Sequence, residues 1–289
     1  MGIIVSILEL ISLGICAGCL GALVGLGGGI IIVPALTLLF KLPIHEAVAT
    51  SLIAVMGTSI SGASSYLKQG LTSIRIGIFL ETATTLGALI GALIALRIPA
   101  YILYIVFSTL AFYTSITQIT SLKKKITREQ TVSIKEIPKT SKILGLVGEY
   151  FDEAEKRSIK YVAIRPWLGW LISFIAGLGS GMLGVGGGFI KVSAMNVFMN
   201  MPIKASVATS KFMIAITAST AATVYLLKGL VNLKIAPIIV LGTALGAKIG
   251  AHIMNKIKSK IIKILFSAVT FYTGYSMLRK GLLTAGIWR

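Results

Sequence analysis

Acidic residues are scarce in this sequence, and charged residues of either sign form a small fraction of it. Only nine of its 289 residues are Asp or Glu, charged residues make up 13% of the chain, and hydrophobic residues make up 55%. The mean hydropathy of +0.91 lies far from the balance of a soluble domain. This shortage of charge excludes a soluble globular protein and indicates a chain that lies in a membrane.

Cysteine and histidine are also rare, with two residues of each. Cys16 and Cys19 lie three apart on an apolar helix and share one face. We interpret them as packing residues, because free cysteine usually behaves as a small hydrophobe; a dithiol that handles sulfur is the alternative. His45 and His252 lie near the ends of expected spans without carboxylate or cysteine partners. We therefore expect neither a metal site nor a cofactor.

Basic residues are the one plentiful kind of charge, and they give the chain a formal net charge of +19. They fall mostly in loops between apolar segments and in a long connector, which is the pattern of cytoplasmic loops in membrane proteins. Because the sequence offers no soluble basic fold, we expect no nucleic-acid partner. The lipid bilayer is therefore the expected surrounding.

Long apolar runs approach or exceed the roughly 20 residues that cross a hydrocarbon core. They cover 76–96, 99–122, 167–190 and 212–227, and the first of them is broken only by Glu81. The N-terminal apolar run has no basic segment before it, so we expect a retained helix and not a signal peptide. The sequence therefore predicts an all-α polytopic integral membrane protein.

An internal repeat divides the chain in two. A shift of 159 positions, without any gap, superimposes glycines, short apolar segments and the tetrapeptide VATS, which stands at 48–51 and at 207–210. Chance similarity would not keep one register over such a length. We predict a first transmembrane repeat at 1–121, a cytoplasmic connector at 122–163 and a second transmembrane repeat at 164–289.

Each half follows one plan, with four long transmembrane helices and a short helix after a glycine-rich break. In the first half we expect helices at 3–23, 30–40, 43–67, 72–96 and 100–121. If 3–40 is a broken helix, the chain crosses eight times with parallel halves; if it is a hairpin, the chain crosses ten times with inverted halves. Unequal basic charge in the equivalent loops at 97 and 256–263 favours inverted halves.

The connector contains the segment GEYFDEAEKRSIKYVAIRP, with strand-like residues on both sides of a charged turn. It is either a β-hairpin or a flexible tether. Small residues recur elsewhere at four-residue spacing, as in Gly14 with Gly18, Gly87 with Gly91, and Gly242 with Gly246. In lipid such spacing lets helix backbones approach closely, so we expect a compact bundle.

Both glycine runs fall inside apolar sequence. Non-helical backbone survives in a membrane only where it is buried in protein or lines a wet cavity, so two equivalent runs predict a cavity. The helix after each run offers free amides and a positive dipole end to an anion. The predicted substrate-binding glycines are Gly25, Gly27, Gly28, Gly29, Gly184, Gly186, Gly187 and Gly188.

The tetrapeptide VATS adds hydroxyls to each half, namely Thr50 and Ser51 in the first and Thr209 and Ser210 in the second. We predict that these hydroxyls donate to a bound anion. The alternative is that they bond to carbonyls of their own helix, as is common in membrane helices.

Ionisable residues within the spans are functional candidates by default. Lys211 follows directly on the second VATS, and we predict that it is the counter-charge of the substrate. Lys191 and Lys248 are either part of the site or extend toward a membrane interface. Glu81 either pairs with a lysine or carries a proton during transport, because a desolvated carboxyl tends to hold its proton.

The sequence resembles the TauE/SafE family of membrane permeases, also called sulfite exporters. The resemblance is carried by GALVGLGGGIIIVPAL and AVATSLIAV in the first half and by GMLGVGGGFIKVSAM and SVATSKF in the second. It covers nearly the whole chain outside the connector. It implies transport of small anionic sulfur compounds such as sulfite, thiosulfate or short organosulfonates across the plasma membrane.

We therefore predict a transporter, acting as an exporter, that works by alternating access around a central anion site between the two repeats. A membrane potential that is negative inside drives an anion outward, so export needs no further energy source. Two other functions stay open at this point, an anion channel with the same site and an intramembrane sulfur-transfer enzyme that uses Cys16 and Cys19. Whether the chain forms a homo-oligomer also stays open.

Overall fold

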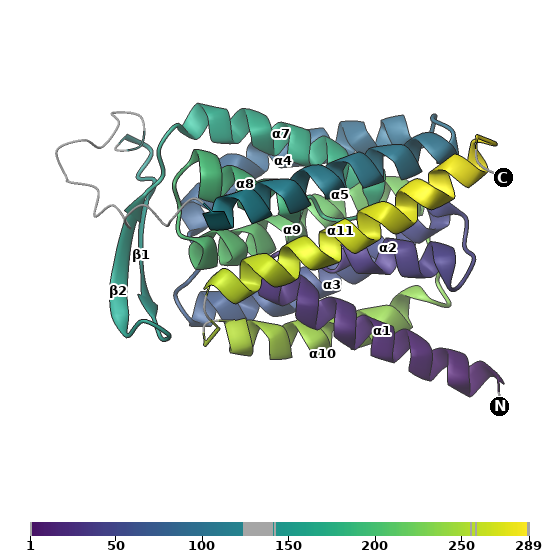
Figure 1. The fold of residues 1–289 in the computed structure, drawn as a ribbon, viewed down its shortest axis with the longest axis horizontal. Coiled ribbons are helices and arrows are strands. Elements are labelled where there is room, and N and C mark those ends of the chain that lie inside the picture. The colour runs from purple at the N-terminus through teal and green to yellow at the C-terminus, as the bar shows by residue number, and fades with distance from the viewer. Residues whose placement is uncertain (1, 124–140, 142, 255, 258, 288–289) are drawn as a thin grey trace.

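The computed structural model describes residues 2–123, 141, 143–254, 256–257 and 259–287, and these form a bundle of helices with a two-stranded hairpin at one end (Figure 1). The helices before the hairpin are α1 (Gly2–Val24), α2 (Gly29–Leu38), α3 (Ile44–Lys68), α4 (Ile74–Ala95) and α5 (Ala100–Lys123). Those after it are α7 (Pro166–Leu183), α8 (Gly188–Ser193), the π-helical turn η2 (Ala194–Phe198), α9 (Ile203–Leu227), α10 (Ala236–Met254) and α11 (Ser259–Thr284).

Six helices are long and apolar enough to cross a membrane, counted over the described residues: α1, α3, α4, α7, α9 and α10. The helix α2 and the Ala100–Tyr113 part of α5 are apolar but shorter. The all-α polytopic membrane fold is therefore confirmed. The count of eight to ten crossings stays a prediction, since α2, α5, α8 and α11 lie outside these six.

The long helices pack in pairs that join the two halves of the chain. Helix α1 packs on α10, α4 on α7, α3 on α9, and α5 on α11. Small residues make the first two contacts close. A side chain at Gly18 would collide with the carbonyl of Thr243, and one at Gly91 with the carbonyl of Leu178. The four-residue glycine spacing thus serves helix packing, as predicted.

Helices α3 and α9 run in opposite directions. Thr50, near the start of α3, accepts a hydrogen bond from Asn232 just after α9, and Thr209, near the start of α9, accepts one from Ser73 just after α3. The same antiparallel order relates α5 and α11, where Ser115 bonds to Ser267 and Tyr104 lies beside Gly281.

The part of the connector that the structure describes contains the predicted hairpin. Strands β1 (Val147–Asp152) and β2 (Arg157–Val162) are antiparallel, with Val147 opposite Val162 and Asp152 opposite Arg157. Figure 1 shows them at the end of the bundle away from both chain termini. The hairpin alternative is confirmed, while residues 124–140 and 142 of the predicted connector lie outside the described residues.

A buried ion pair fastens the hairpin to the bundle. Asp152 accepts a hydrogen bond of 2.7 Å from the ammonium group of Lys204 in the first turn of α9, and both side chains are almost fully buried. Beside it the Tyr150 and Tyr161 rings pack edge to face, with their centroids 6.3 Å apart. Burial raises the pKa of Tyr161 to about 12, so its phenol is neutral at physiological pH.

Candidate functional site

The glycine runs interrupt the helices where the sequence predicts. Gly25, Gly27 and Gly28 have positive φ, as do their counterparts Gly184, Gly186 and Gly187. Residues with a Cβ rarely adopt this left-handed conformation. Helix α1 therefore ends at Val24 and α2 begins at Gly29, while α7 ends at Leu183 and α8 begins at Gly188.

The two breaks contact each other directly in the middle of the bundle. A side chain at Gly188 would collide with the carbonyl oxygen of Gly25, and one at Gly29 with the carbonyl oxygen of Gly184. The glycines thus allow backbone to lie against backbone. The expectation of an open cavity between the two runs is wrong for this conformation, because the two backbones fill that space themselves.

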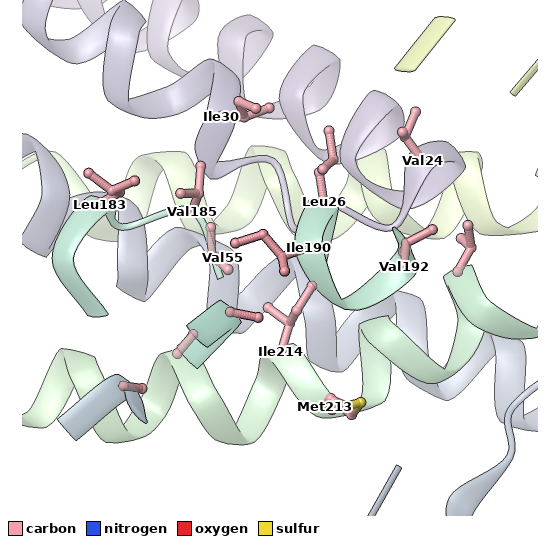
Figure 2. Close-up of a cluster of buried hydrophobic side chains, with 14 of the residues drawn as sticks. Val24, Leu26, Ile30, Val55, Leu183, Val185, Ile190, Val192, Met213 and Ile214 are labelled. Carbon is pink, nitrogen blue, oxygen red and sulfur yellow. The ribbon is translucent and has the colours of Figure 1, made fainter. Parts of the chain in front are cut away.

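Apolar side chains cover the crossing on the sides shown in Figure 2. Val55 from α3 and Ile214 from α9 contact both Gly27 and Gly186. Leu26, Ile30, Val185 and Val192, which are almost fully buried, complete the cluster. The crossing is therefore buried among apolar side chains in this conformation. We expect a ligand to reach its amides only after the two breaks separate.

The amides at these breaks are nevertheless short of partners. In the first break Leu26 donates to Gly21, and Ile31 and Ile32 both donate to Gly28. Within the described chain this leaves the amides of 27–30 without a backbone acceptor. These are the orphan donors that a helix start offers to an anion.

The VATS hydroxyls hold the breaks in place. The Ser51 hydroxyl donates to the carbonyl of Gly184 at 2.9 Å, and the Ser210 hydroxyl donates to the carbonyl of Gly25 at 3.2 Å. Each serine thus reaches the break of the other half. Thr50 and Thr209 accept hydrogen bonds from backbone amides of loops, as given above. The four VATS hydroxyls therefore bond to other segments of the chain and not to carbonyls of their own helices.

Lys211 is the most unusual charged group near the crossing. It is fully buried, and its ammonium nitrogen has no hydrogen-bond partner within the described residues. The methylenes of Lys211 run along Gly62 of α3, with Cδ 3.5 Å from where a Cβ on that glycine would lie. One turn earlier on α3, the buried Ser59 hydroxyl also lacks a partner and lies beside Gly27.

Ser59 and Gly62 were not identified from the sequence. Their counterparts in the second half are Ala218 and Ala221, so the repeat gave no signal at either position. Together with Lys211 they place two unpartnered polar atoms on facing helices, α3 and α9, next to the glycine crossing.

Glu81 pairs with a lysine, which is one of its two predicted roles. Its carboxylate lies 3.6 Å from the ammonium of Lys191 and accepts hydrogen bonds from the hydroxyls of Thr84 at 2.6 Å, Thr85 at 3.2 Å and Thr217 at 2.5 Å. Lys191 also donates to Thr217 at 2.5 Å and is fully buried. The alternative in which Lys191 extends to a membrane interface is therefore wrong.

The remaining candidates lie apart from these groups. Lys248 is exposed on the outer face of α10, and Cys16 and Cys19 are free thiols, the first exposed and the second partly so. The His45 ring contacts the carbonyl of Ala95 at 3.1 Å. In the described chain no three His, Cys, Asp or Glu residues lie close enough to hold a metal ion.

A further lysine that the sequence did not mark acts at the end of α2. The ammonium of Lys280, on α11, donates to the carbonyl of Thr37 and lies 5.8 Å from the centre of the Tyr104 ring. A cation at a helix C-terminus is favoured by the dipole of the helix. This contact ties the far end of α2 to α11.

The chain is similar to known membrane transporter proteins over most of its length. The family model described as "Sulfite exporter TauE/SafE" matches residues 10–277. The curated "Probable membrane transporter protein YunE" of Bacillus subtilis is 29% identical over 287 residues, covering 96% of this chain and all of that protein. No solved structure matches the chain.

Two further relatives are similar over comparable lengths. The "Probable membrane transporter protein YdhB" of Bacillus subtilis is 28% identical, covering 89% of this chain and 92% of that protein. The "Probable membrane transporter protein MJ0441" of Methanocaldococcus jannaschii is 27% identical, covering 93% and 94%.

Proposed function

The chain belongs to the sulfite exporter TauE/SafE family, and we propose that it carries small sulfur-containing anions across the plasma membrane. The family and the curated relatives make it a membrane transporter and not an enzyme. The substrates we propose are sulfite, thiosulfate or short organosulfonates. The curated relatives are named only as probable transporters, so the sulfur chemistry comes from the family description.

One observation carries this proposal, the unpartnered ammonium of Lys211. A charge buried without a partner is costly, and ionisable residues inside membrane proteins face functional cavities or one another. An anion that binds beside Lys211 would neutralise this charge. The hydroxyl of Ser59 and, once the breaks separate, the amides of both glycine runs and the VATS hydroxyls would supply hydrogen bonds to its oxygens.

We further propose that residues 1–121 and 164–289 are inverted repeats and that transport proceeds by alternating access between them. The support lies in contacts that occur in pairs 159 positions apart. The Tyr66 hydroxyl donates to Ala22 at 2.8 Å, and its counterpart Tyr225 donates to Gly181 at 2.9 Å. The antiparallel courses of α3 and α9 fit the same scheme, as do inverted repeats in many transporters.

Export is the direction that the membrane potential favours. A potential that is negative inside contributes about 2.3 kcal/mol per 100 mV for each negative charge moved outward. With the basic connector on the cytoplasmic side, as the distribution of Lys and Arg favours, the anion would leave the cell without another energy source. Import would need a coupled ion, and Glu81 is the acid we propose for that role.

Counterflow in proteoliposomes tests the proposal. Vesicles loaded with unlabelled thiosulfate should accumulate labelled thiosulfate transiently, which a carrier does and a channel does not. Lys211→Met should abolish this accumulation, while Lys248→Met, an exposed lysine in the same protein, should leave it unchanged. Full counterflow in Lys211→Met would contradict the proposal. Replacement of Cys16 and Cys19 by serine should have little effect, whereas the enzyme alternative requires that it abolish function.

A further inference from the structure

The buried charges around Glu81 have no equivalent in the other half of the molecule. A shift of 159 positions relates Glu81 to Val240, Lys191 to Ile32 and Thr217 to Thr58. Both threonines bond to a carbonyl of their own helix, Thr58 to Ala54 at 2.7 Å and Thr217 to Met213 at 3.0 Å. Only Thr217 also contacts charged groups. Helix α10 packs on α3 as α4 packs on α9. A helix contact at this position of the repeat therefore also forms without buried charges.

The Glu81 carboxylate lies among hydroxyl and ammonium groups that can bind an oxyanion. Three hydroxyls donate to its two oxygens, and the ammonium of Lys191 lies 3.6 Å away. The Thr217 hydroxyl lies between the two charges, at 2.5 Å from each. Hydroxyls and an ammonium hold a carboxylate by the same hydrogen bonds that would hold a sulfur oxyanion.

We propose that Lys191 and Thr217 form a second anion-binding position, which Glu81 occupies in this conformation and which a substrate oxyanion takes once Glu81 is protonated. The proposal rests on the proposed function, in which Glu81 is the acid for a coupled ion, and adds the binding position through which a proton and an anion would be linked. The carboxylate takes one proton from the aqueous phase and becomes neutral, so Lys191 loses its counter-ion. The anion replaces that counter-ion, and one proton is bound for each anion bound. Departure of the anion lets Glu81 lose the proton and pair with Lys191 again.

Few other titratable groups lie on the helices that pack against Glu81. Helix α4 packs on α7, which has no charged residue, and on α9, which carries Lys204 and Lys211. Lys204 is paired with Asp152 in the hairpin, and the side chain of Lys211 runs along Gly62 on α3. On α4 itself, Arg75 reaches Gly145 beside the hairpin. Lys191 of α8 is the cation that lies within 4 Å of the carboxylate among the described residues.

Calorimetric titration of the purified full-length protein with thiosulfate tests this coupling. Thiosulfate keeps its charge from mildly acidic to mildly alkaline pH, so any proton taken up belongs to the protein. Titrations in buffers of different ionisation enthalpy should give about one proton taken up per anion where Glu81 starts ionised. In that range the affinity should rise about tenfold for each unit by which the pH falls.

Three variants make the test specific. Glu81→Gln, which cannot ionise, should bind thiosulfate with the same affinity at mildly acidic and mildly alkaline pH and with no proton uptake. That affinity should equal the affinity of the native protein at mildly acidic pH. Lys191→Gln should lose the proton-linked part of binding. Val240→Gln, at the equivalent position of the other half, should leave both affinity and proton uptake unchanged. Proton uptake that persists in Glu81→Gln would overturn the proposal.

The outcomes also separate this inference from the proposed function. Native protein that binds thiosulfate without proton uptake overturns the coupling alone. Native protein that binds none of sulfite, thiosulfate or sulfoacetate overturns both. If Glu81→Gln does not fold, the double variant Glu81→Val with Lys191→Ile copies the apolar contact of the other half. It should fold and bind more weakly without pH dependence, and pH-dependent binding by it would overturn the proposal.

Discussion

The contact between α4 and α9 and the contact between α10 and α3 are built alike but filled differently. At the first, Glu81 lies among three threonine hydroxyls and Lys191. At the second, Val240 packs on Gly57, and the Thr243 hydroxyl donates to the carbonyl of Ala54 at 3.2 Å. Apolar contacts suffice to bring such helices together. The charged version is therefore best explained by what it does during transport, because a buried ion pair is weak evidence for stability.

The glycine crossing differs from these contacts because the same glycines recur in both breaks and their contacts are reciprocal. Gly29 faces Gly184, and Gly188 faces Gly25. The molecule thus combines a symmetric backbone crossing with an asymmetric set of buried charges. Substitutions of the glycines test the backbone crossing, and substitutions of the charged residues test the ion pair, independently of each other.

The largest effect is expected at the crossing. Gly188→Leu and Gly29→Leu should each prevent folding, because both side chains would collide with a carbonyl of the opposite break. The measurement is the yield of monodisperse protein in detergent. Gly229→Asn is the control, since nothing lies within 4 Å of that glycine and asparagine tolerates its positive φ. If only one of the two leucine variants is harmful, the crossing is not symmetric in energy.

The next effect concerns the charge pair. Lys191→Ile alone should cost about 3–5 kcal/mol, because it leaves the buried Glu81 without its cation. Adding Glu81→Val should recover most of that loss, since the pair is then replaced by the apolar residues of the other half. Unfolding by steric trapping or by heat in detergent would measure both variants. Ile32→Met at the equivalent position should change stability by less than about 1.5 kcal/mol. A double variant no more stable than the single one would mean that the fold requires the charges.

The smallest effect is expected at the two serines, each of which bonds to the glycine break of the other half. Ser51→Ala and Ser210→Ala each remove one hydrogen bond to a buried carbonyl, which should cost about 1–3 kcal/mol. The two losses should agree within about 0.5 kcal/mol when measured by the same unfolding assay. Selective loss of transport in one serine variant, at unchanged stability, would instead favour direct contact between that hydroxyl and the substrate.

The sequence predicted the features that leave a local trace. Left-handed backbone at Gly25 and Gly184 demands glycine, and close contacts at Gly18 and Gly91 demand small residues, so both are visible in the residue types. The same reasoning misjudged what the glycines face. A glycine that admits a ligand and a glycine that admits another backbone look alike in a sequence, so the cavity was predicted where two backbone segments of the chain touch.

The buried contacts between distant segments were beyond the sequence. Glu81 had two predicted roles and no named partner, because Lys191 lies in the other half and the repeat has no equivalent pair. Ser59 and Gly62 gave no signal for the same reason. The VATS hydroxyls were identified as important, but repetition marks a buried hydrogen bond to backbone as readily as a contact to substrate.

The ion pair between Asp152 and Lys204 has a mechanical consequence. Helix α9 carries Lys204 at its first turn, Lys211 two turns later and Thr217 beyond that. The ion pair with the hairpin and one residue of each proposed anion position therefore lie on the same helix. If α9 moves, either the two strands move with it or the carboxylate of Asp152 separates from the ammonium of Lys204. The fluorescence of a dye at the exposed Phe151 position should therefore change when α9 moves relative to the rest of the bundle.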